Sequence, residues 1–249
     1  MKTVHRRELL FATIFLLIAC ELTALAVNQP ILPAPAVVAQ AFIVELCRGL
    51  VGHFLSSLWR VVASTFLAIL LAAPAGMILG QSPRLDSFFS QLLYLLYTIP
   101  KVVFVPVILL LFGVGDLQKI AIIFLIMFFQ ILVLVRDQAA AIRPELVQSV
   151  RSLGAGRRAL FRYVYLPASL PAILTALRQS VGTAVAVLYV AESFATQRGL
   201  GYYIVLNQST LFNYPAMYAG IIAMSMLGLG LYFSVDWVER RLCPWLFIT

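Results

Sequence analysis

Residues 143–167 read RPELVQSVRSLGAGRRALFRYVYLP. The apolar residues of the first half recur at the spacing of one helix face, and those of the second half begin another face. Gly154 and Gly156, between the two halves, can adopt a positive φ and end the first helix. Pro167 is expected to stop the second helix and to start the next segment. The stretch predicts two short helices joined at a glycine corner, forming a knob whose apolar face needs a partner surface.

Long apolar runs flank this stretch and recur along the chain. A helix needs about 20 apolar residues to cross the hydrocarbon core of a bilayer. The runs that qualify are Leu9–Val27, Val61–Gly80, Ser87–Phe112, Leu117–Val135, Ala168–Glu192 and Pro215–Val235. Ala36–Leu58 reads instead as an amphipathic helix that lies on the outer surface or enters the next span. We therefore predict an all-α membrane protein with about six transmembrane helices.

The composition excludes several classes of protein. Of 249 residues, 62% are hydrophobic and 11% are charged, whereas soluble domains carry about a quarter charged residues. A water-soluble fold could not hide this much apolar surface, so soluble enzymes, disordered tails and nucleic-acid binders are excluded. The net charge of +8 is typical of the basic cytoplasmic loops of a membrane protein. The three cysteines lie far apart with no CxxC pair, so neither a metal site nor a disulfide framework is predicted.

The basic residues predict the orientation of the chain. Lys and Arg concentrate in the cytoplasmic loops of membrane proteins. With a cytoplasmic N-terminus, the opposite side keeps only Arg48, Arg60, Lys119 and Arg198, so both termini are expected inside. Leu9–Cys20 could alternatively be a signal peptide. The apolar run continues past Cys20, however, which suits a retained span.

Two features of the spans bear on packing and on a solute path. Small residues every fourth position in the second span favour close helix packing over a path: Ser64, Ala68, Ala72, Gly76 and Gly80. The third span is interrupted by Pro100 and Pro106, and Lys101 lies roughly 20 Å from its inner end. Polar groups at such depth are candidates for a path or for helix–helix hydrogen bonds. These candidates are Lys101, Gln130, Arg178, Gln179 and Glu192. Two cations in one cavity would favour an anionic solute.

The second half of residues 143–167 contains a spacing of residues that is found in a known protein family. Gly154 is followed after nine residues by Val164 and, one residue later, by Leu166-Pro167. This pattern resembles the signature loop of permease subunits of bacterial ABC importers, although the leading triplet, Gln148-Ser149-Val150, departs from the Glu-Ala-Ala of that family. Pro100, Phe112–Gly115 and Gly199–Tyr202 resemble the nitrate/sulfonate/taurine branch of the same family.

This resemblance implies a type I importer permease of the bacterial inner membrane. Its coupling loop would dock an ABC ATPase subunit through Gln148, Ser149, Val150, Leu153, Gly154, Ala155, Val164, Leu166 and Pro167. A second copy of the chain is expected as a homodimer partner, and an external binding protein is expected to deliver the solute. Residues 1–249 would form one permease domain, with an N-terminal helix and outer segment (1–50), a core (51–245) and the coupling loop (143–167).

No catalytic constellation and no phosphate-binding Gly-x-x-x-x-Gly-Lys-Ser/Thr loop is found in the sequence. ATP and Mg²⁺ are therefore expected on the partner ATPase and not on this chain. An ion-coupled secondary transporter is the main alternative, and it would be expected to show internal repeats and intramembrane acids. A non-transporting scaffold is the second alternative, and it would not need a broken span with an intramembrane lysine.

Overall fold

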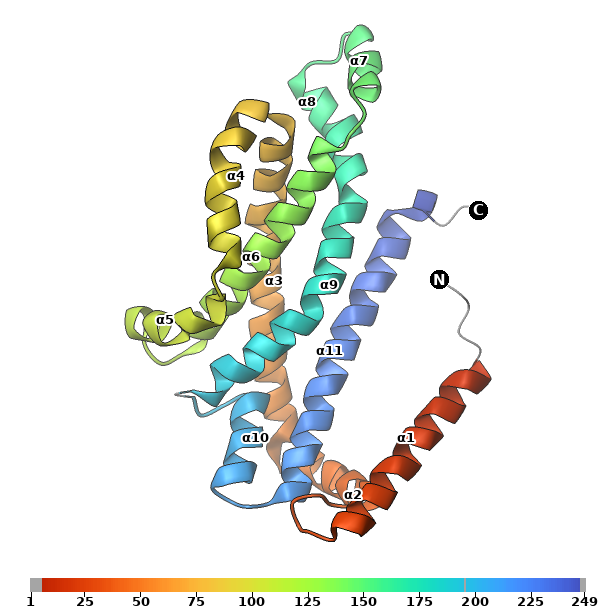
Figure 1. The fold of residues 1–249 in the computed structure, drawn as a ribbon, viewed down its shortest axis with the longest axis vertical. Coiled ribbons are helices and arrows are strands. Elements are labelled where there is room, and N and C mark those ends of the chain that lie inside the picture. Colours follow the sequence, from red (N-terminus) through yellow and green to blue (C-terminus); the bar gives the residue numbers. More distant parts are fainter. Residues whose placement is uncertain (1–5, 195, 247–249) are drawn as a thin grey trace. The chain divides into compact units, whose positions relative to one another are not determined.

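Helices cover every predicted apolar run in the computed structural model, which describes residues 6–194 and 196–246 (Figure 1). The spans correspond to α1 (Arg6–Val27), α3 (Val51–Gln81), α4 with α5 (Pro83–Thr98 and Val105–Phe112), α6 (Asp116–Ala140), α9 (Leu166–Ser193) and α11 (Tyr214–Leu242). Over the described residues, four helical stretches are long and apolar enough to cross a membrane, or five if a bent pair forms one span. The all-α prediction is confirmed.

The chain divides into two units. Unit 1 comprises Met1–Ser56 and Gln197–Ser225, and unit 2 comprises Ser57–Thr196 and Met226–Thr249. The long helices α3 and α11 each contribute residues to both units. Unit 2 contains all of the predicted loop and path residues, together with the hydrogen bonds and ion pairs that surround them, so the site can be described within it. The short elements of unit 1 are held together by their own contacts.

Unit 1 is held by polar contacts between elements distant in sequence. The backbone N–H of Gly199 donates to His53 Nδ1 at 3.1 Å, next to the start of α10 (Leu200–Ser209). Tyr203 Oη donates to Glu45 Oε2 at 2.8 Å. Burial, together with this hydrogen bond, raises the pKa of the Tyr203 hydroxyl far above its usual value. The hydroxyl is therefore a permanent donor that ties α10 to the end of α2 (Pro35–Glu45).

Ala36–Leu58 is helical and enters the next span, one of the two predicted placements, but it is not one regular amphipathic helix. The segment consists of α2, a π-helical turn (Leu46–Leu50) and the start of α3. Gly49 has a φ of 123° and kinks the chain at this turn, a conformation that glycine adopts without steric cost. In α2 only Val38 is buried, and apolar side chains lie on all of its faces. It therefore has no single apolar face to lay on a surface.

Unit 2 is built around α6 and α9, which lie side by side (Figure 1). The small-residue face of α3 packs against α6, as the four-residue spacing predicts. A Cβ added to Gly76 would lie 2.8 Å from the carbonyl oxygen of Leu132, and Ser64, Ala68 and Ala72 are fully buried. Helix backbones can approach this closely only where side chains are small.

The third predicted span, Ser87–Phe112, is not one continuous helix. It consists of α4, a 3₁₀ turn (Lys101–Phe104) and α5, and the two parts are bent by 77°. Pro100 precedes the turn and Pro106 lies in the first turn of α5, where the missing amide donor costs nothing. The prolines predicted an interruption of this span, and the structure shows that the helices on either side of it are bent by 77°.

Candidate functional site

The predicted knob is present at one end of unit 2 (Figure 1). It consists of α7 (Pro144–Ser152), α8 (Arg157–Leu160) and a π-helical turn (Phe161–Tyr165) that leads into α9. Gly154 forms the corner with a φ of 82°, and its N–H donates to the carbonyl of Arg151 at 2.9 Å. Gly156 does not adopt a positive φ, so the corner rests on Gly154 alone.

The knob continues directly into α9. The prediction that Pro167 stops the second helix is wrong, because helical structure runs from Arg158 to Ser193. Pro167 lies in the first turn of α9, where it leaves no intrahelical hydrogen bond unmade, and the π turn accommodates the extra residue before it. The end of the knob and α9 therefore form one helical stretch of 36 residues.

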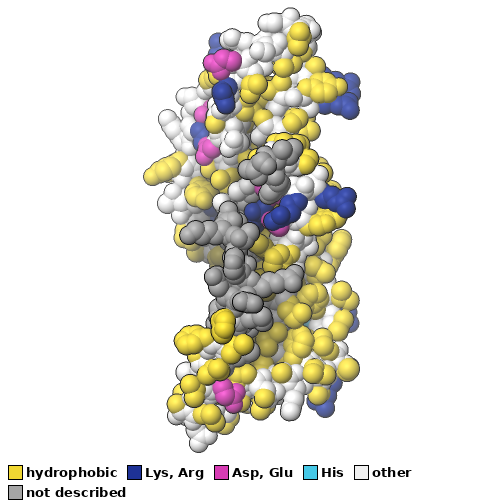
Figure 2. Space-filling model, turned by 90° about the vertical axis from the view of Figure 1, so that its right-hand side faces the viewer, with side chains coloured by type: hydrophobic (Ala, Val, Ile, Leu, Met, Phe, Trp, Pro, Cys, Tyr) yellow, Lys and Arg dark blue, Asp and Glu magenta, His cyan; other side chains and the backbone are white. Residues whose placement is uncertain are grey.

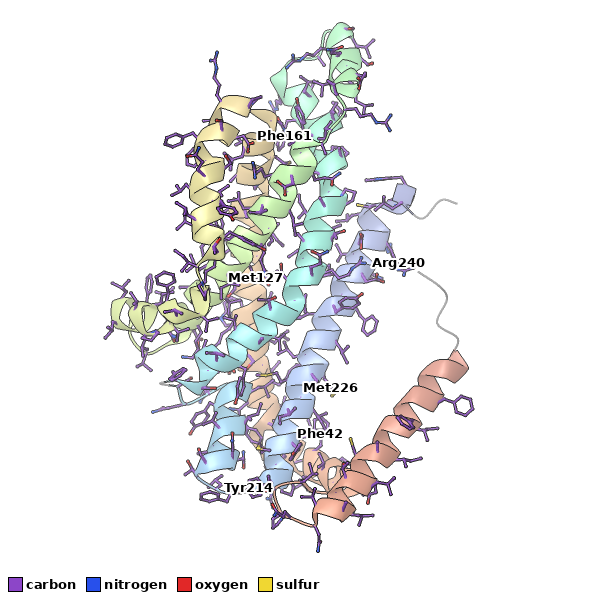
Figure 3. The ribbon with its side chains drawn as sticks, viewed as in Figure 1. Phe42, Met127, Phe161, Tyr214, Met226 and Arg240 are labelled. Carbon is purple, nitrogen blue, oxygen red and sulfur yellow. The ribbon has the colours of Figure 1, made fainter. Side chains whose placement is uncertain are left out.

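The outer surface of the knob carries large exposed apolar side chains among polar ones. Leu153 is 86% exposed and Leu146 54% exposed, and no residue of α7 is buried in this chain. Leu160 and Val164 are buried and hold the knob to unit 2; Phe161, labelled in Figure 3, is partly exposed. Of the other predicted loop residues, Gln148, Ser149, Gly154 and Leu166 are exposed, and Val150, Ala155 and Pro167 are half-buried. A hollow of about 240 Å³ beneath α7 leaves the helix loosely packed on its inner side.

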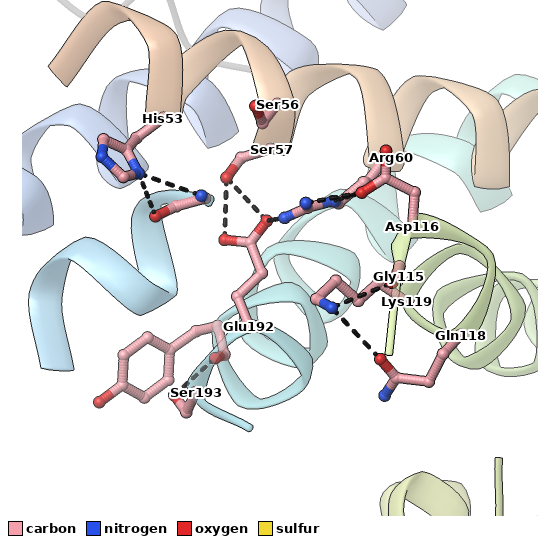
Figure 4. A network of polar contacts seen from close by, with 12 residues as sticks. His53, Ser56, Ser57, Arg60, Gly115, Asp116, Gln118, Lys119, Glu192 and Ser193 are labelled. Carbon is pink, nitrogen blue, oxygen red and sulfur yellow. Dashed lines mark hydrogen bonds and ion pairs between the residues drawn. The ribbon is translucent and has the colours of Figure 1, made fainter. Parts of the chain in front are cut away.

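A second cluster of polar residues joins three helices at the far ends of α6 and α9 (Figure 4). We call Ser57, Arg60, Asp116 and Glu192 the Arg60 cluster. Arg60 Nη1 donates to Glu192 Oε1 at 2.5 Å, and Arg60 Nε donates to Asp116 Oδ1 at 2.8 Å. The hydroxyl of Ser57 lies 2.8–2.9 Å from both Glu192 oxygens. Arg60 is 4% exposed and Glu192 fully buried, so the pair is shielded from solvent.

The structure buries Arg60 and Lys119, two charges that the sequence assigned to the outer side of the membrane. Lys119 lies near the start of the span Leu117–Val135, and the structure buries it fully. Its Nζ donates to the carbonyl of Gly115 at 3.0 Å and to Gln118 Oε1 at 3.4 Å. Arg60 was missed as a site residue because its partner Glu192 lies 132 positions away. An arginine followed by an uncharged apolar run was the only local signal.

The N-terminal half of α9 is joined to α11 by a second group of ion pairs. Arg178 contacts Glu239 and lies 3.4 Å from Asp236 Oδ1. Asp236 Oδ2 also accepts from Nε of Arg240, labelled in Figure 3, at 2.8 Å. The charge of Arg178 is therefore balanced by carboxylates of α11.

Lys101 lies at the break between α4 and α5. Its Nζ donates to the carbonyls of Tyr97 at 3.0 Å and Ile99 at 3.4 Å. It also lies 5.1 Å from the ring centroids of both Tyr97 and Phe129. Lys101 thus donates to carbonyls near the end of α4, where the helix leaves them without intrahelical donors.

The remaining path candidates have different surroundings. Gln130 follows Phe129 on α6, and its Oε1 is buried with no hydrogen-bond partner among the described residues. Gln179 is exposed. An apolar hollow of about 410 Å³ lies between the broken span and the end of α9. Its lining residues are Val102, Val103, Val105, Pro106, Leu109, Val190 and Phe194. Across the described part of the chain, no group of three metal-binding side chains occurs.

Comparison with known proteins identifies the family. Residues 64–243 match the family model described as "Binding-protein-dependent transport system inner membrane component". The chain is 30% identical to the taurine transport system permease protein TauC of Escherichia coli over 193 residues, which cover 78% of this chain and 70% of TauC. It is 29% identical to a putative aliphatic sulfonates transport permease protein, SsuC of Bacillus subtilis, over 88% of this chain and 79% of SsuC.

The fold agrees with this assignment. A chain of the inward-facing MetNI methionine ABC transporter superposes with a TM-score of 0.67 and 19% identity. The superposition covers 80% of this chain and 98% of that chain. These likenesses favour an ATP-driven importer over an ion-coupled secondary transporter. The chain therefore belongs to the family of binding-protein-dependent transport system inner membrane components, as a multi-pass permease subunit of an ABC importer with the type I fold.

Proposed function

We propose that the knob formed by α7, α8 and the π turn docks one ABC ATPase subunit. The observation that supports this proposal is that Leu146 of α7 and Leu153, directly after it, are exposed and that no residue of α7 is buried within the described chain. The proposed contact residues are those predicted from the sequence: Gln148, Ser149, Val150, Leu153, Gly154, Ala155, Val164, Leu166 and Pro167. Large apolar side chains on a small projecting element favour burial against a protein partner.

We further propose the assembly in which this docking occurs. Two copies of the chain pair as a homodimer, with both termini cytoplasmic and residues 51–245 as the permease core. An external binding protein delivers the solute, while ATP and Mg²⁺ are bound by the ATPase subunits. Closure of the ATPases displaces the knob, and the continuous helix into α9 carries this displacement into the membrane.

Replacing Gly154 with valine is expected to abolish ATPase docking. The φ of 82° at this corner is unfavourable for a β-branched residue, at a cost of roughly 1–2 kcal/mol, so α7 is reoriented. Stoichiometric co-purification of the ATPase should be lost, while the permease still inserts into the membrane. The measurement is quantitative mass spectrometry of the tagged permease extracted in mild detergent.

Gly156→Val is the matched control. It adds the same side chain two residues away, at a position without a positive φ and with open space around a new Cβ. Co-purification should remain close to that of the original chain. Full docking and transport by the Gly154 variant would contradict the proposed role of the corner.

The solute class is proposed to be a small organic anion, since Lys101 is a cation in a predicted span and a relative is described as a putative transport permease for aliphatic sulfonates. Lys101→Ala is expected to lower uptake of an aliphatic sulfonate into vesicles containing the complete transporter. The midpoint of thermal unfolding of the Lys101→Ala variant is measured in parallel, because Lys101 also donates a hydrogen bond to the Tyr97 carbonyl and its loss can lower stability. Undiminished uptake would contradict a path role for Lys101.

A further inference from the structure

The last turns of α11 present a cation and indole rings that the proposed coupling does not use. Trp237 is 60% exposed and Trp245, just beyond the helix, 48% exposed. The guanidinium carbon of Arg241 lies 5.3 Å from the centroid of the Trp237 ring. This distance is within the range of a cation–π contact, so the ring orients the guanidinium while leaving its outer N–H groups exposed.

The neighbouring charges leave Arg241 as an uncompensated cation. Asp236 accepts from Arg240 and also pairs with Arg178, and Glu239 pairs with Arg178. Arg241 forms no ion pair within residues 6–194 and 196–246. The two acids are thus matched by two arginines, and the end of α11 carries one positive charge in excess.

The position of this cation in the chain favours a lipid. Helix α11 is apolar and long enough to cross a membrane, and Arg241 precedes its last residue, Leu242. Tryptophan is enriched at the membrane–water interface, where its ring is apolar and its N–H meets water. Figure 2 shows Lys and Arg side chains among hydrophobic ones in the upper half of the view. Arg241 lies over the exposed Trp237 ring and is followed by the exposed Leu242. This combination of charge and apolar surface suits a molecule that has an anionic headgroup and an apolar chain.

We propose that Trp237 and Arg241 bind the headgroup of an anionic phospholipid of the bilayer. The guanidinium donates to phosphate oxygens, Trp237 holds it in place, and the acyl chains lie along the exposed apolar side chains of α11. A basic residue at a membrane surface changes affinity for anionic lipid by about fivefold. This inference rests on α11 being a membrane span and is independent of ATPase docking.

The test is native mass spectrometry of the full-length chain in detergent, titrated with phosphatidylglycerol and, separately, with phosphatidylcholine. Phosphatidylglycerol is expected to be retained in preference, and Arg241→Gln is expected to lower its retention about fivefold. Trp237→Leu leaves the charge unchanged and removes the ring, and it should weaken retention as well.

Arg240→Gln is the matched control, because it removes the same charge from the adjacent residue, whose guanidinium donates to Asp236. It should lower retention less than Arg241→Gln. If the two variants lost the same amount of bound phosphatidylglycerol, the lipid would be held by the overall positive charge of the surface. That result would overturn the proposed site. Equal retention of the two lipids would overturn it too. Binding of soluble glycerol phosphate as strongly as phosphatidylglycerol would identify a free-phosphate site and overturn the lipid proposal.

Discussion

Arg60→Met is expected to lower the free energy of unfolding by about 3–5 kcal/mol, the range found when one partner of a buried ion pair is removed. Glu192 is fully buried and takes its charged hydrogen bond from Arg60 at 2.5 Å. Without the guanidinium, the carboxylate stays buried and loses its charged hydrogen bond from Arg60. The measurement is equilibrium unfolding of the purified chain in mixed micelles.

Two further variants separate the ion pair from general disruption. Asp116→Asn removes the other carboxylate of the Arg60 cluster, whose side chain is 53% exposed, and should cost only about 0–1 kcal/mol. Arg60→Met combined with Glu192→Gln removes both buried charges and should recover most of the lost stability. A double variant as unstable as Arg60→Met alone would contradict this explanation.

Gly76→Ala is expected to cost about 1–3 kcal/mol, the usual penalty for overpacking a dense interface. The added methyl group would lie 2.8 Å from the Leu132 carbonyl oxygen and 3.1 Å from the backbone nitrogen of Arg136. Backbone atoms of α6 cannot rotate away, so α3 and α6 must separate. The same unfolding experiment measures the loss.

Gly182→Ala is the matched control for this substitution. Gly182 also lies inside a long helix, but nothing lies within 4 Å of a Cβ added there. Alanine should stabilise α9 by about 0.5–1 kcal/mol, because glycine loses more backbone entropy on folding. Equal effects of the two substitutions would mean that the close approach of α3 to α6 does not limit stability.

Much of this architecture was predictable because it depends on local physics. A span must hold about 20 apolar residues, so hydropathy alone located the helices. The repeat of small residues in α3 predicted a close helix contact, and Gly76 makes one with α6. The glycine corner followed from the conformational freedom of Gly154, and the interruption of the third span followed from its prolines.

The partners of the charged residues could not be predicted in this way. From the sequence, Arg60 and Lys119 are charges on the outer side, and Arg178 and Glu192 are candidates for a solute path. The structure places Arg60 on Glu192 and Arg178 on Glu239, which makes the surroundings of each charge a property of helices distant in sequence. Their role in a solute path remains a prediction.

The sequence by itself determined the membrane environment, the helices, the breaks and the exposed knob, since each depends on the chemistry of a few consecutive residues. Only the tertiary structure decided the 77° bend of the third span, the continuous helix from the knob into α9, and the pairing of buried charges. Burial in a medium of low dielectric constant makes an isolated charge costly. The sequence therefore indicates that partners are required, and helix packing decides which side chains they are.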